Sequence, residues 1–302
     1  MAVVGPTGSG KSALALRVAE AVGAGILSLD SMQVYRGMDI GTAKPTPAQR
    51  MRVHHAMVDV VDPETDYSVA EFQSEARREL GAKDGPMLIV GGSGLHFRAV
   101  VDPLEFPPTD TDTRAAVEEM NDDALRDELT RHDPNAGEVV DLQNRRRLVR
   151  AVEILRLTGR TPSERAADAA ARQVRDYRAL MPVRIFGVDR RNDEAYAQRL
   201  ATRVDDMRDQ GLLDEVSGLR DRMGRQASQA VGYKELIDVV DGATDVESGF
   251  ARVTTSTRVL VKRQRTFFRR DPRIEWFDLD RDEARAVAAV AEALTQPEAV
   301  NR

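Results

Sequence analysis

The sequence predicts an α/β fold with a mostly parallel sheet flanked by helices, interrupted by an all-helical segment. Short apolar runs alternate with helical patterns over the first hundred residues, as expected for βαβ units, whose strands run parallel. From about residue 109 polar, charged helical patterns replace the strands, and a buried strand pattern returns after Pro182. We therefore expect an α/β core formed by residues 1–107 and 182–302, with a helical insertion domain over residues 108–181.

The first half is expected to supply four strands. Their patterns lie at residues 2–4, 26–29, 57–61 and 87–90. A helical pattern follows the first strand, and another covers residues 68–80. In that second helix Ser68 and Glu71 match the S-x-x-E signature, in which each residue satisfies a free backbone N–H at the helix start.

The second half is expected to begin with helices alone. Their patterns lie at residues 112–119, 122–131, 145–157 and 161–171. After the insertion, the pattern indicates further elements in this order: a buried strand at 183–188, a helix at 193–210 ended by Gly211, a second helix, a loop at 227–232, a long basic helix around 249–270 and a short strand at 274–279.

The most specific motif lies at residues 5–12, Gly-Pro-Thr-Gly-Ser-Gly-Lys-Ser, a full match to G-x-x-x-x-G-K-[ST] and typical of a P-loop NTPase-like sheet. Its glycines let backbone N–H groups surround a diphosphate, and the following helix adds its positive dipole end. Lys11 would place a charge on phosphate oxygens, and the Ser12 hydroxyl would ligate Mg²⁺. The candidate diphosphate-binding residues of this loop are Gly5, Pro6, Thr7, Gly8, Ser9, Gly10, Lys11 and Ser12.

Asp30 ends the second strand pattern and is the best-placed carboxylate for the phosphate loop. In a P-loop NTPase an aspartate at such a position orients Mg²⁺. The sequence leaves three roles open for Asp30, namely metal organiser, general base and N-cap of a helix near Ser31, and Asp59 or Asp62 is a poorer metal candidate. Because ligands of parallel sheets gather at the carboxyl ends of strands, Ser12, Asp30 and Ser93 could share one crevice.

The composition restricts the class of protein. Of the 302 residues, 41% are hydrophobic and 31% charged, as is usual for a globular protein. No apolar stretch approaches the roughly 20 residues of a membrane span, and no signal peptide precedes the phosphate loop. The absence of cysteine excludes disulfides, thiolate zinc sites and cysteine nucleophiles, and it fits a cytoplasmic location. Only four residues precede Gly5, which makes the first strand unusually short, and we expect a start that is either truncated or misassigned.

The distribution of charge is uneven. The net charge of −6 argues against indiscriminate nucleic-acid binding. Yet two basic clusters stand out, the first formed by Arg145, Arg146, Arg147 and Arg150 and the second by Arg258, Lys262, Arg263, Arg265, Arg269 and Arg270. Such clusters either hold a shaped polyanion or form solvated helix faces.

The order of the motifs along the chain is more specific than any one of them. After the phosphate loop come Asp-Ser-Met-Gln-Val-Tyr, Gly-Met-Asp-Ile-Gly-Thr-Ala-Lys-Pro, a His-His pair, Asp-Pro, Tyr-Ser and Gly-Gly-Ser-Gly-Leu. These stand at residues 30–35, 37–45, 54–55, 62–63, 67–68 and 91–95, and further matches follow at 146–150, 230–235 and 262–264. Over nearly its whole length the chain thus resembles the bacterial tRNA dimethylallyltransferases, also called tRNA isopentenyltransferases.

The resemblance implies an activity. A dimethylallyl group would pass from its diphosphate to N6 of the adenosine 3′ of the anticodon, in tRNAs reading codons that start with U. Lys11, Ser12 and Mg²⁺ would act on the diphosphate, and Arg203 matches a family arginine expected there. Asp30 matches the general base that takes the amine proton. The adenosine would have to be flipped out of its stack.

The resemblance also implies partners, tRNA through its anticodon stem-loop and dimethylallyl diphosphate, with no membrane and no obligate protein partner. The insertion domain would contact the anticodon arm. The family's tRNA contacts fall on Asp30, Ser31, Met32, Gln33, Ser93, Arg114, Arg146, Arg147, Leu148, Val149, Arg150, Gln229, Gly232, Tyr233, Lys234, Lys262, Arg263, Arg265 and Arg269.

Some features depart from the family or leave other functions open. His96 stands where the family usually has tyrosine, and His54 with His55 lacks the further ligands of a metal site. No cysteine-rich zinc finger is present, unlike in eukaryotic relatives. The alternatives are a small-molecule kinase or ATPase, a non-catalytic RNA-binding module, and a transferase acting on free adenine nucleotides. The arginine-rich insertion favours tRNA over a nucleotide.

Overall fold

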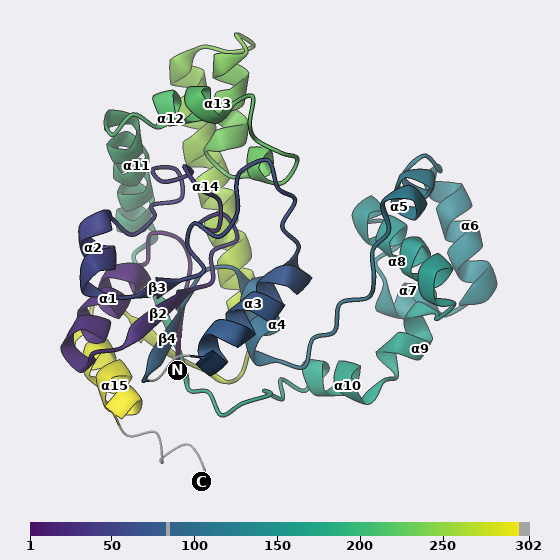
Figure 1. Ribbon diagram of the computed structural model, residues 1–302, viewed down its shortest axis with the longest axis horizontal. Helices are drawn as coiled ribbons and strands as arrows, with labels where there is room; N and C mark the ends of the chain where they lie inside the picture. Colours follow the sequence, from purple (N-terminus) through teal and green to yellow (C-terminus); the bar gives the residue numbers. More distant parts are fainter. Residues whose placement is uncertain (83–84, 296–302) are drawn as a thin grey trace. The chain divides into compact units, whose positions relative to one another are not determined.

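The computed structural model describes residues 1–82 and 85–295 (Figure 1). The chain forms two compact units. One comprises Met1–Val101 and the chain from Met181 onward, and the other is Asp102–Leu180.

The α/β unit is built on a single sheet of six strands, in the order β3-β2-β4-β1-β5-β6. The strands are β1 Ala2–Val4, β2 Gly25–Ser28, β3 His55–Ala56, β4 Met87–Gly91, β5 Ile185–Asp189 and β6 Ile274–Asp278. Every pairing is parallel, which confirms the predicted α/β fold. Because β1 lies at the centre, the loop that follows it emerges in the middle of the sheet edge where ligands of such folds bind.

The sheet is covered on both faces, as its continuous apolar strands require. Val3 belongs to the core built with α1 (Lys11–Val22) and α15 (Glu283–Thr295). Its neighbours Ala2 and Val4 point into the other core, because side chains alternate along a strand. The helices that contribute to this second core are α3 Val69–Ala82, α4 Gly94–Val101, α11 Asp193–Asp209, α12 Leu212–Leu219, α13 Tyr233–Val240 and α14 Val246–Phe268 (Figure 1).

The helical unit forms a core of its own around α8 (Arg145–Thr158). Leu148 and Val152 of α8 are fully buried beside Val117 and Leu125. The other helices of this unit are α5 Thr111–Glu118, α6 Asp122–His132, α7 Ala136–Val139, α9 Pro162–Ala166 and α10 Ala169–Arg175. Asn144 starts α8 by accepting a hydrogen bond from the Arg147 N–H, a common N-cap arrangement.

Two predicted elements are wrong in extent. The strand here is β3, which consists of His55–Ala56 and ends before the residues 57–61 predicted for it. Met57 and Asp59 adopt φ values of 61° and 57°, a left-handed conformation that cannot continue a strand. The helix expected at 161–171 is two helices, α9 and α10, since the backbone of Asp168 is extended. Within the described part of the chain, no helix is both long and apolar enough to cross a membrane.

Candidate active site

The phosphate-loop residues connect β1 to α1, and the loop packs tightly against β5. At Gly5 a Cβ atom would lie 2.1 Å from the carbonyl oxygen of Val188, so only glycine fits. Gly8 and Gly10 have φ values of 82° and 102°, which a residue with a side chain rarely adopts. The motif therefore needs glycine at residue 5 because a side chain would not fit there, and at residues 8 and 10 because of their backbone conformation.

Side chains from beyond the motif fix the orientation of the loop's peptide groups. The carbonyl of Thr7 accepts from the Tyr196 hydroxyl at 2.5 Å. The next two carbonyls, of Gly8 and Ser9, accept from the guanidinium Nε atoms of Arg199 and Arg190 at 3.1 and 3.2 Å. Among the described residues, the N–H groups of Gly8 and Gly10 donate to no protein atom, and they are free to bind an anion.

Tyr196, Arg199 and Arg190 were missed at the sequence level. They lie about 190 residues from the loop, with separations of 189, 191 and 181 residues. No local motif marks them, because their role depends on the way the end of β5 and α11 pack against the loop.

The loop opens into a cavity of about 730 Å³, where the structure brings together the predicted residues Lys11, Ser12, Asp30, Gln33 and Arg203. Burial lowers the pKa of Lys11 from 10.5 to about 8, because desolvation disfavours the ammonium form, while Asp30 offsets part of this effect and Arg203 adds to it. Burial also lowers the pKa of Arg203, opposed by the charge of Asp30. Two desolvated cations beside one carboxylate favour an anionic ligand here.

Asp30 follows β2 and starts a turn rather than a helix. Its Oδ1 accepts from the Met32 N–H at 2.9 Å, and the described chain between β2 and α2 (Pro47–Arg52) contains no helix. Of the three roles left open by the sequence, the helix N-cap is therefore wrong. Ser28 and Gln33 brace this turn, with 2.8 Å between the Ser28 hydroxyl and Gln33 Oε1.

The other acidic candidates are engaged elsewhere. Asp59 is ion-paired with Lys44 at 2.7 Å and also with Arg50, and Asp62 pairs with Arg36 at 3.4 Å. Across residues 1–82 and 85–295, no group of three or more His, Cys, Asp or Glu side chains is placed to hold a metal ion.

Ser93 and His96 form a pair after β4. The Ser93 hydroxyl and His96 Nδ1 are 2.7 Å apart, and the edge of the Phe72 ring packs on the imidazole at 4.6 Å between centroids. Burial lowers the pKa of His96 to about 4, with Asp30 opposing the shift. The imidazole is therefore neutral near pH 7 and serves as a packed hydrogen-bond partner of Ser93.

A carboxylate that the sequence did not reveal organises the glycine-rich loop at 37–45. Glu215 of α12 accepts from three successive backbone N–H groups, those of residues 39–41, at 2.8–3.2 Å. It also accepts from the Tyr233 hydroxyl at 2.6 Å. Tyr233 is fully buried, so its ring supports this loop from within the protein.

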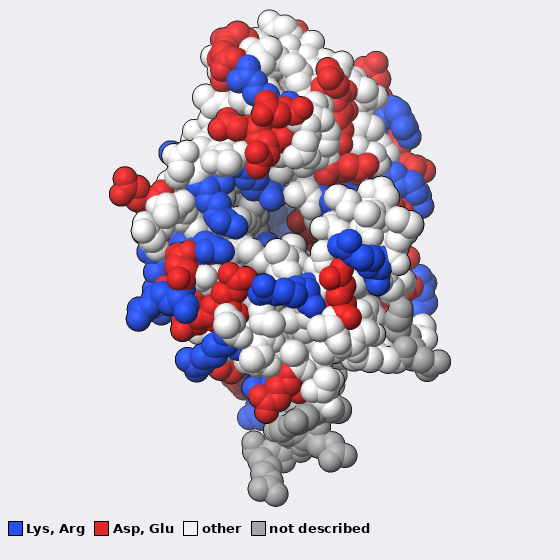
Figure 2. Space-filling view, turned by 90° about the vertical axis from the view of Figure 1, so that its left-hand side faces the viewer, with Lys and Arg blue, Asp and Glu red and all other residues white. Residues whose placement is uncertain are grey.

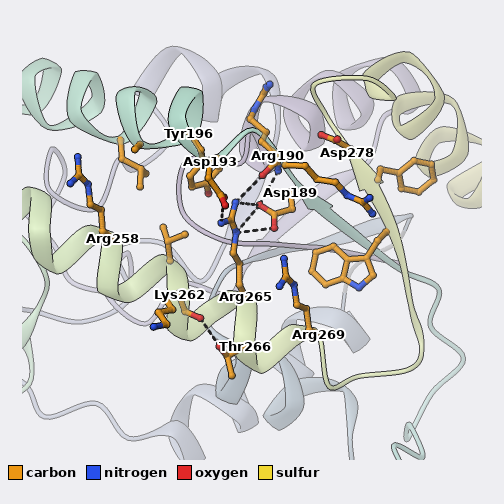
Figure 3. A pocket seen from close by; sticks show the side chains of 16 residues that line it. Asp189, Arg190, Asp193, Tyr196, Arg258, Lys262, Arg265, Thr266, Arg269 and Asp278 are labelled. Carbon is orange, nitrogen blue, oxygen red and sulfur yellow. Dashed lines mark hydrogen bonds and ion pairs between the residues drawn. The ribbon is translucent and has the colours of Figure 1, made fainter.

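The predicted RNA contacts of the α/β unit differ in exposure. Lys262 and Arg263 on α14 and Arg269, which directly follows it, are exposed, and no described residue forms an ion pair with them. Arg265 instead turns inward, with its guanidinium 2.9 Å from Asp189 and 3.0 Å from Asp193 (Figure 3). Among the remaining predicted contacts, Gln229 and Lys234 are exposed, Ser31, Met32, Gln33 and Ser93 are partly exposed, and Gly232 is buried.

In the helical unit, the predicted contacts fall into three kinds. Arg146 and Arg147 are exposed at the start of α8, whereas Leu148 and Val149 are buried in the core of the unit. Arg114 and Arg150 both bind Glu153, whose carboxylate is fully buried, at 3.1 and 2.8 Å. The sequence gave no sign of this shared carboxylate.

The surface of the molecule is hollowed on the side where α1, α2 and α11 lie in Figure 1. Figure 2 shows this face, with Lys and Arg side chains gathered around the hollow and acidic side chains mostly farther out. The surroundings of the hollow are therefore more basic than the chain as a whole, whose net charge is −6, and they suit a negatively charged ligand.

Comparison with known proteins gives consistent matches. Residues 33–271 match the IPP transferase family, and residues 1–59 match the isopentenyl transferase family. The tRNA dimethylallyltransferase of Bifidobacterium longum (strain NCC 2705) is 38% identical, covering 97% of this chain and 92% of that protein. The tRNA dimethylallyltransferase of Parafrankia sp. is 42% identical, with 96% and 91% covered.

Solved structures agree with these matches. The full-length tRNA isopentenylpyrophosphate transferase of Bacillus halodurans has a TM-score of 0.67 at 33% identity, covering 99% of this chain and 97% of that one. A eukaryotic dimethylallyltransferase acting on tRNA has a TM-score of 0.79 at 23% identity, with 100% and 79% covered, and it supports the fold alone.

Proposed function

The chain belongs to the IPP transferase family, and from this premise we propose that it transfers a dimethylallyl group from dimethylallyl diphosphate to a tRNA. The acceptor is N6 of the adenosine immediately 3′ of the anticodon, in tRNAs that read codons starting with U, and diphosphate is released. One observation carries the proposal. Lys11, Asp30 and Arg203 face one cavity at the phosphate loop, where a leaving group and a base are needed.

The phosphate loop binds the diphosphate in this proposal. The free N–H groups of Gly8 and Gly10 surround its oxygens, while Lys11 and Arg203 meet its charge from within the cavity. As the C1–O bond breaks, negative charge grows on the leaving oxygen, and donors already oriented toward it stabilise the transition state. Because both cations are desolvated in the free protein, binding of diphosphate restores their preference for the charged form.

Ser12 is the residue proposed to hold Mg²⁺. Magnesium typically takes few protein ligands, and substrate phosphate oxygens and water complete its shell. The absence of a multi-acid cluster from the described residues fits such a site. When bound, the ion neutralises charge on the diphosphate and so makes it a better leaving group.

Asp30 is the proposed general base. The lone pair of the adenine amine is delocalised into the ring, so the amine needs to lose a proton as it attacks. In the reaction the N6–C1 bond forms, the C1–O bond breaks with its electron pair passing to diphosphate, and one N6 proton moves to the Asp30 carboxylate. Oδ1 is held by the Met32 N–H, which orients the carboxylate for this transfer.

RNA binding is proposed to use both units, with residues 108–181 acting as the domain that contacts the anticodon arm. Exposed Arg146, Arg147, Lys262, Arg263 and Arg269 supply charge for the RNA backbone. Because its substrate is tRNA, we place the enzyme in the cytoplasm.

Incubation with labelled dimethylallyl diphosphate, in parallel with unmodified tRNA, AMP and no acceptor, tests the function. We expect label in the tRNA alone, at the adenosine 3′ of the anticodon. Label in AMP would instead favour a transferase of free nucleotides. Hydrolysis of ATP with no label in RNA would favour a kinase or ATPase.

A further inference from the structure

The two peptide groups that flank Thr7 are each held by a side chain from outside the phosphate loop. Its N–H donates to Oε1 of Gln264 at 2.8 Å, and its carbonyl accepts from the Tyr196 hydroxyl at 2.5 Å. The N–H belongs to the Pro6–Thr7 peptide and the carbonyl to the Thr7–Gly8 peptide, so neither peptide group can rotate without losing a hydrogen bond. Thr7 directly precedes Gly8, whose N–H faces the proposed diphosphate, so these two contacts help to set the direction of that donor.

Residues of α14 take part in both contacts, Gln264 directly and Arg265 by packing on Tyr196. Gln264 belongs to this helix, and its neighbour Arg265 lies 4.5 Å above the Tyr196 ring. Arg265 is itself fixed by Asp189 at the end of β5 and by the Arg190 carbonyl, each at 2.9 Å or less (Figure 3). Two successive residues of α14 thus act on the two peptide groups that flank Thr7, Gln264 directly and Arg265 through an aromatic ring.

The same helix presents unpartnered cations. Arg258, Lys262, Arg265 and Arg269 line a cavity of about 880 Å³ (Figure 3). Their spacing of three or four residues places them on one face of the helix. Arg265 forms the inner wall, whereas no described residue pairs with the side chains of Arg258, Lys262 or Arg269. Phosphate groups of an RNA bound there would lie directly above the Arg265–Tyr196–Thr7 connection.

We propose that α14 couples RNA binding to diphosphate binding, with Gln264 and Arg265 as positioning residues for the phosphate loop. The inference rests on the proposed function, since it requires both ligands. RNA held by the α14 cations favours the helix position in which Gln264 and Arg265 fix Thr7, and a diphosphate favours the same loop arrangement. Each ligand therefore tightens the binding of the other, by the same factor.

Gln264→Met tests this coupling, because methionine matches the length and volume of glutamine but accepts no strong hydrogen bond. The dissociation constant of inorganic diphosphate with Mg²⁺ is measured by calorimetry, alone and with a saturating unmodified anticodon stem-loop. These two ligands do not react, so both measurements are at equilibrium. In the wild-type protein we expect the stem-loop to tighten diphosphate binding by roughly fivefold or more. In Gln264→Met this factor should fall close to one, while the affinity for stem-loop alone changes by less than about twofold, since coupling is the only term removed.

Tyr196→Phe serves as a second variant, because it removes the hydroxyl on the Thr7 carbonyl and keeps the ring under Arg265. It should reduce the factor as well. Gln210→Met, at an exposed glutamine after α11, is the matched control and should keep the wild-type factor. In steady-state assays Gln264→Met should raise the KM for dimethylallyl diphosphate more than it lowers kcat.

Three results would overturn the inference. The first two are that the stem-loop leaves the affinity of the wild-type protein for diphosphate unchanged, or that it weakens this affinity. The third is that the stem-loop tightens diphosphate binding in both Gln264→Met and Tyr196→Phe by the same factor as in the wild type. In each case labelled dimethylallyl diphosphate can still modify the tRNA. Failure of the coupling is therefore distinct from failure of the proposed function, which would appear as the absence of labelled tRNA.

Discussion

The phosphate loop and the helical unit present nitrogen donors to anions in different ways. In the loop, the carbonyls of Thr7, Gly8 and Ser9 are each fixed by a side chain, so that neighbouring N–H groups point one way. In the helical unit, Arg146 and Arg147 are exposed and form no ion pair with a described residue. The difference reflects their proposed tasks. Bond breaking needs donors aligned within fractions of an ångström, whereas an RNA backbone is held mainly by charge.

The largest effect is expected from Asp30→Asn, which keeps an oxygen for the Met32 N–H but cannot accept the proton. We expect kcat to fall by about 10²–10⁴-fold, the usual contribution of a general base, with RNA affinity within about twofold of wild type. Single-turnover assays and RNA binding measurements check this. Asp62→Asn, at an aspartate paired with Arg36, is the control and should remain active. Equal losses of rate and of RNA affinity would refute the assignment.

The next largest effect is expected in the pH dependence of kcat/KM for dimethylallyl diphosphate, through Lys11 of the phosphate loop. The pKa of Lys11 is lowered to about 8, so the charged form persists below that pH and is lost as the pH rises through it. kcat/KM for dimethylallyl diphosphate, which reports the free enzyme, should fall about tenfold per pH unit above 8. In Lys11→Arg, the remaining activity should lack this fall, because arginine stays protonated. A flat wild-type profile between pH 7 and 9 would contradict the role of Lys11.

Charge reversal on the helical unit should have a smaller effect. Arg147→Glu is expected to raise the KM for tRNA severalfold and to reduce the slope of log affinity against log salt by about one. The chemical step should be unchanged at saturating tRNA. Arg178→Glu, at an exposed arginine of the same unit, is the control. An unchanged salt slope in Arg147→Glu would remove this residue from the RNA interface.

The smallest effect on chemistry is expected from Glu153→Gln. The buried carboxylate binds Arg114 and Arg150, and hydrogen bonds to charged groups contribute about 2 kcal/mol. We expect a lower unfolding temperature and weaker tRNA binding, but kcat within about twofold of wild type at saturating tRNA. Thermal unfolding and steady-state kinetics measure this, with the exposed Glu119→Gln as control. A large loss of kcat would contradict the proposed division of tasks, in which the helical unit binds RNA and the phosphate loop takes part in the chemical step.

Patterns confined to a few neighbouring residues were the most predictable from the sequence. The glycines of the loop and the alternation of strands and helices arise from local geometry, and the structure contains them. The helices at α6 and α8 begin at the predicted residues 122 and 145, because Asn121 and Asn144 cap them. The strand predicted at 57–61 is wrong, since Met57 and Asp59 adopt a left-handed backbone conformation that interrupts the extended chain.

Contacts made between distant parts of the chain could not be predicted. Gln264 meets Thr7 across 257 residues, and Glu153 reaches Arg114 across 39. Arg265 was grouped with its basic neighbours, but Asp189 draws it inward. In each case a side chain of ordinary type acquires its role from the packing of helices, which local patterns do not encode.

A crystal structure with a nonhydrolysable dimethylallyl diphosphate analogue and an unmodified anticodon stem-loop would test the central claim most directly. The account predicts the diphosphate on the N–H groups of Gly8 and Gly10, the allylic carbon facing a flipped adenine, and an Asp30 oxygen within hydrogen-bond reach of N6. A diphosphate bound away from Lys11, or an adenine remote from Asp30, would contradict it.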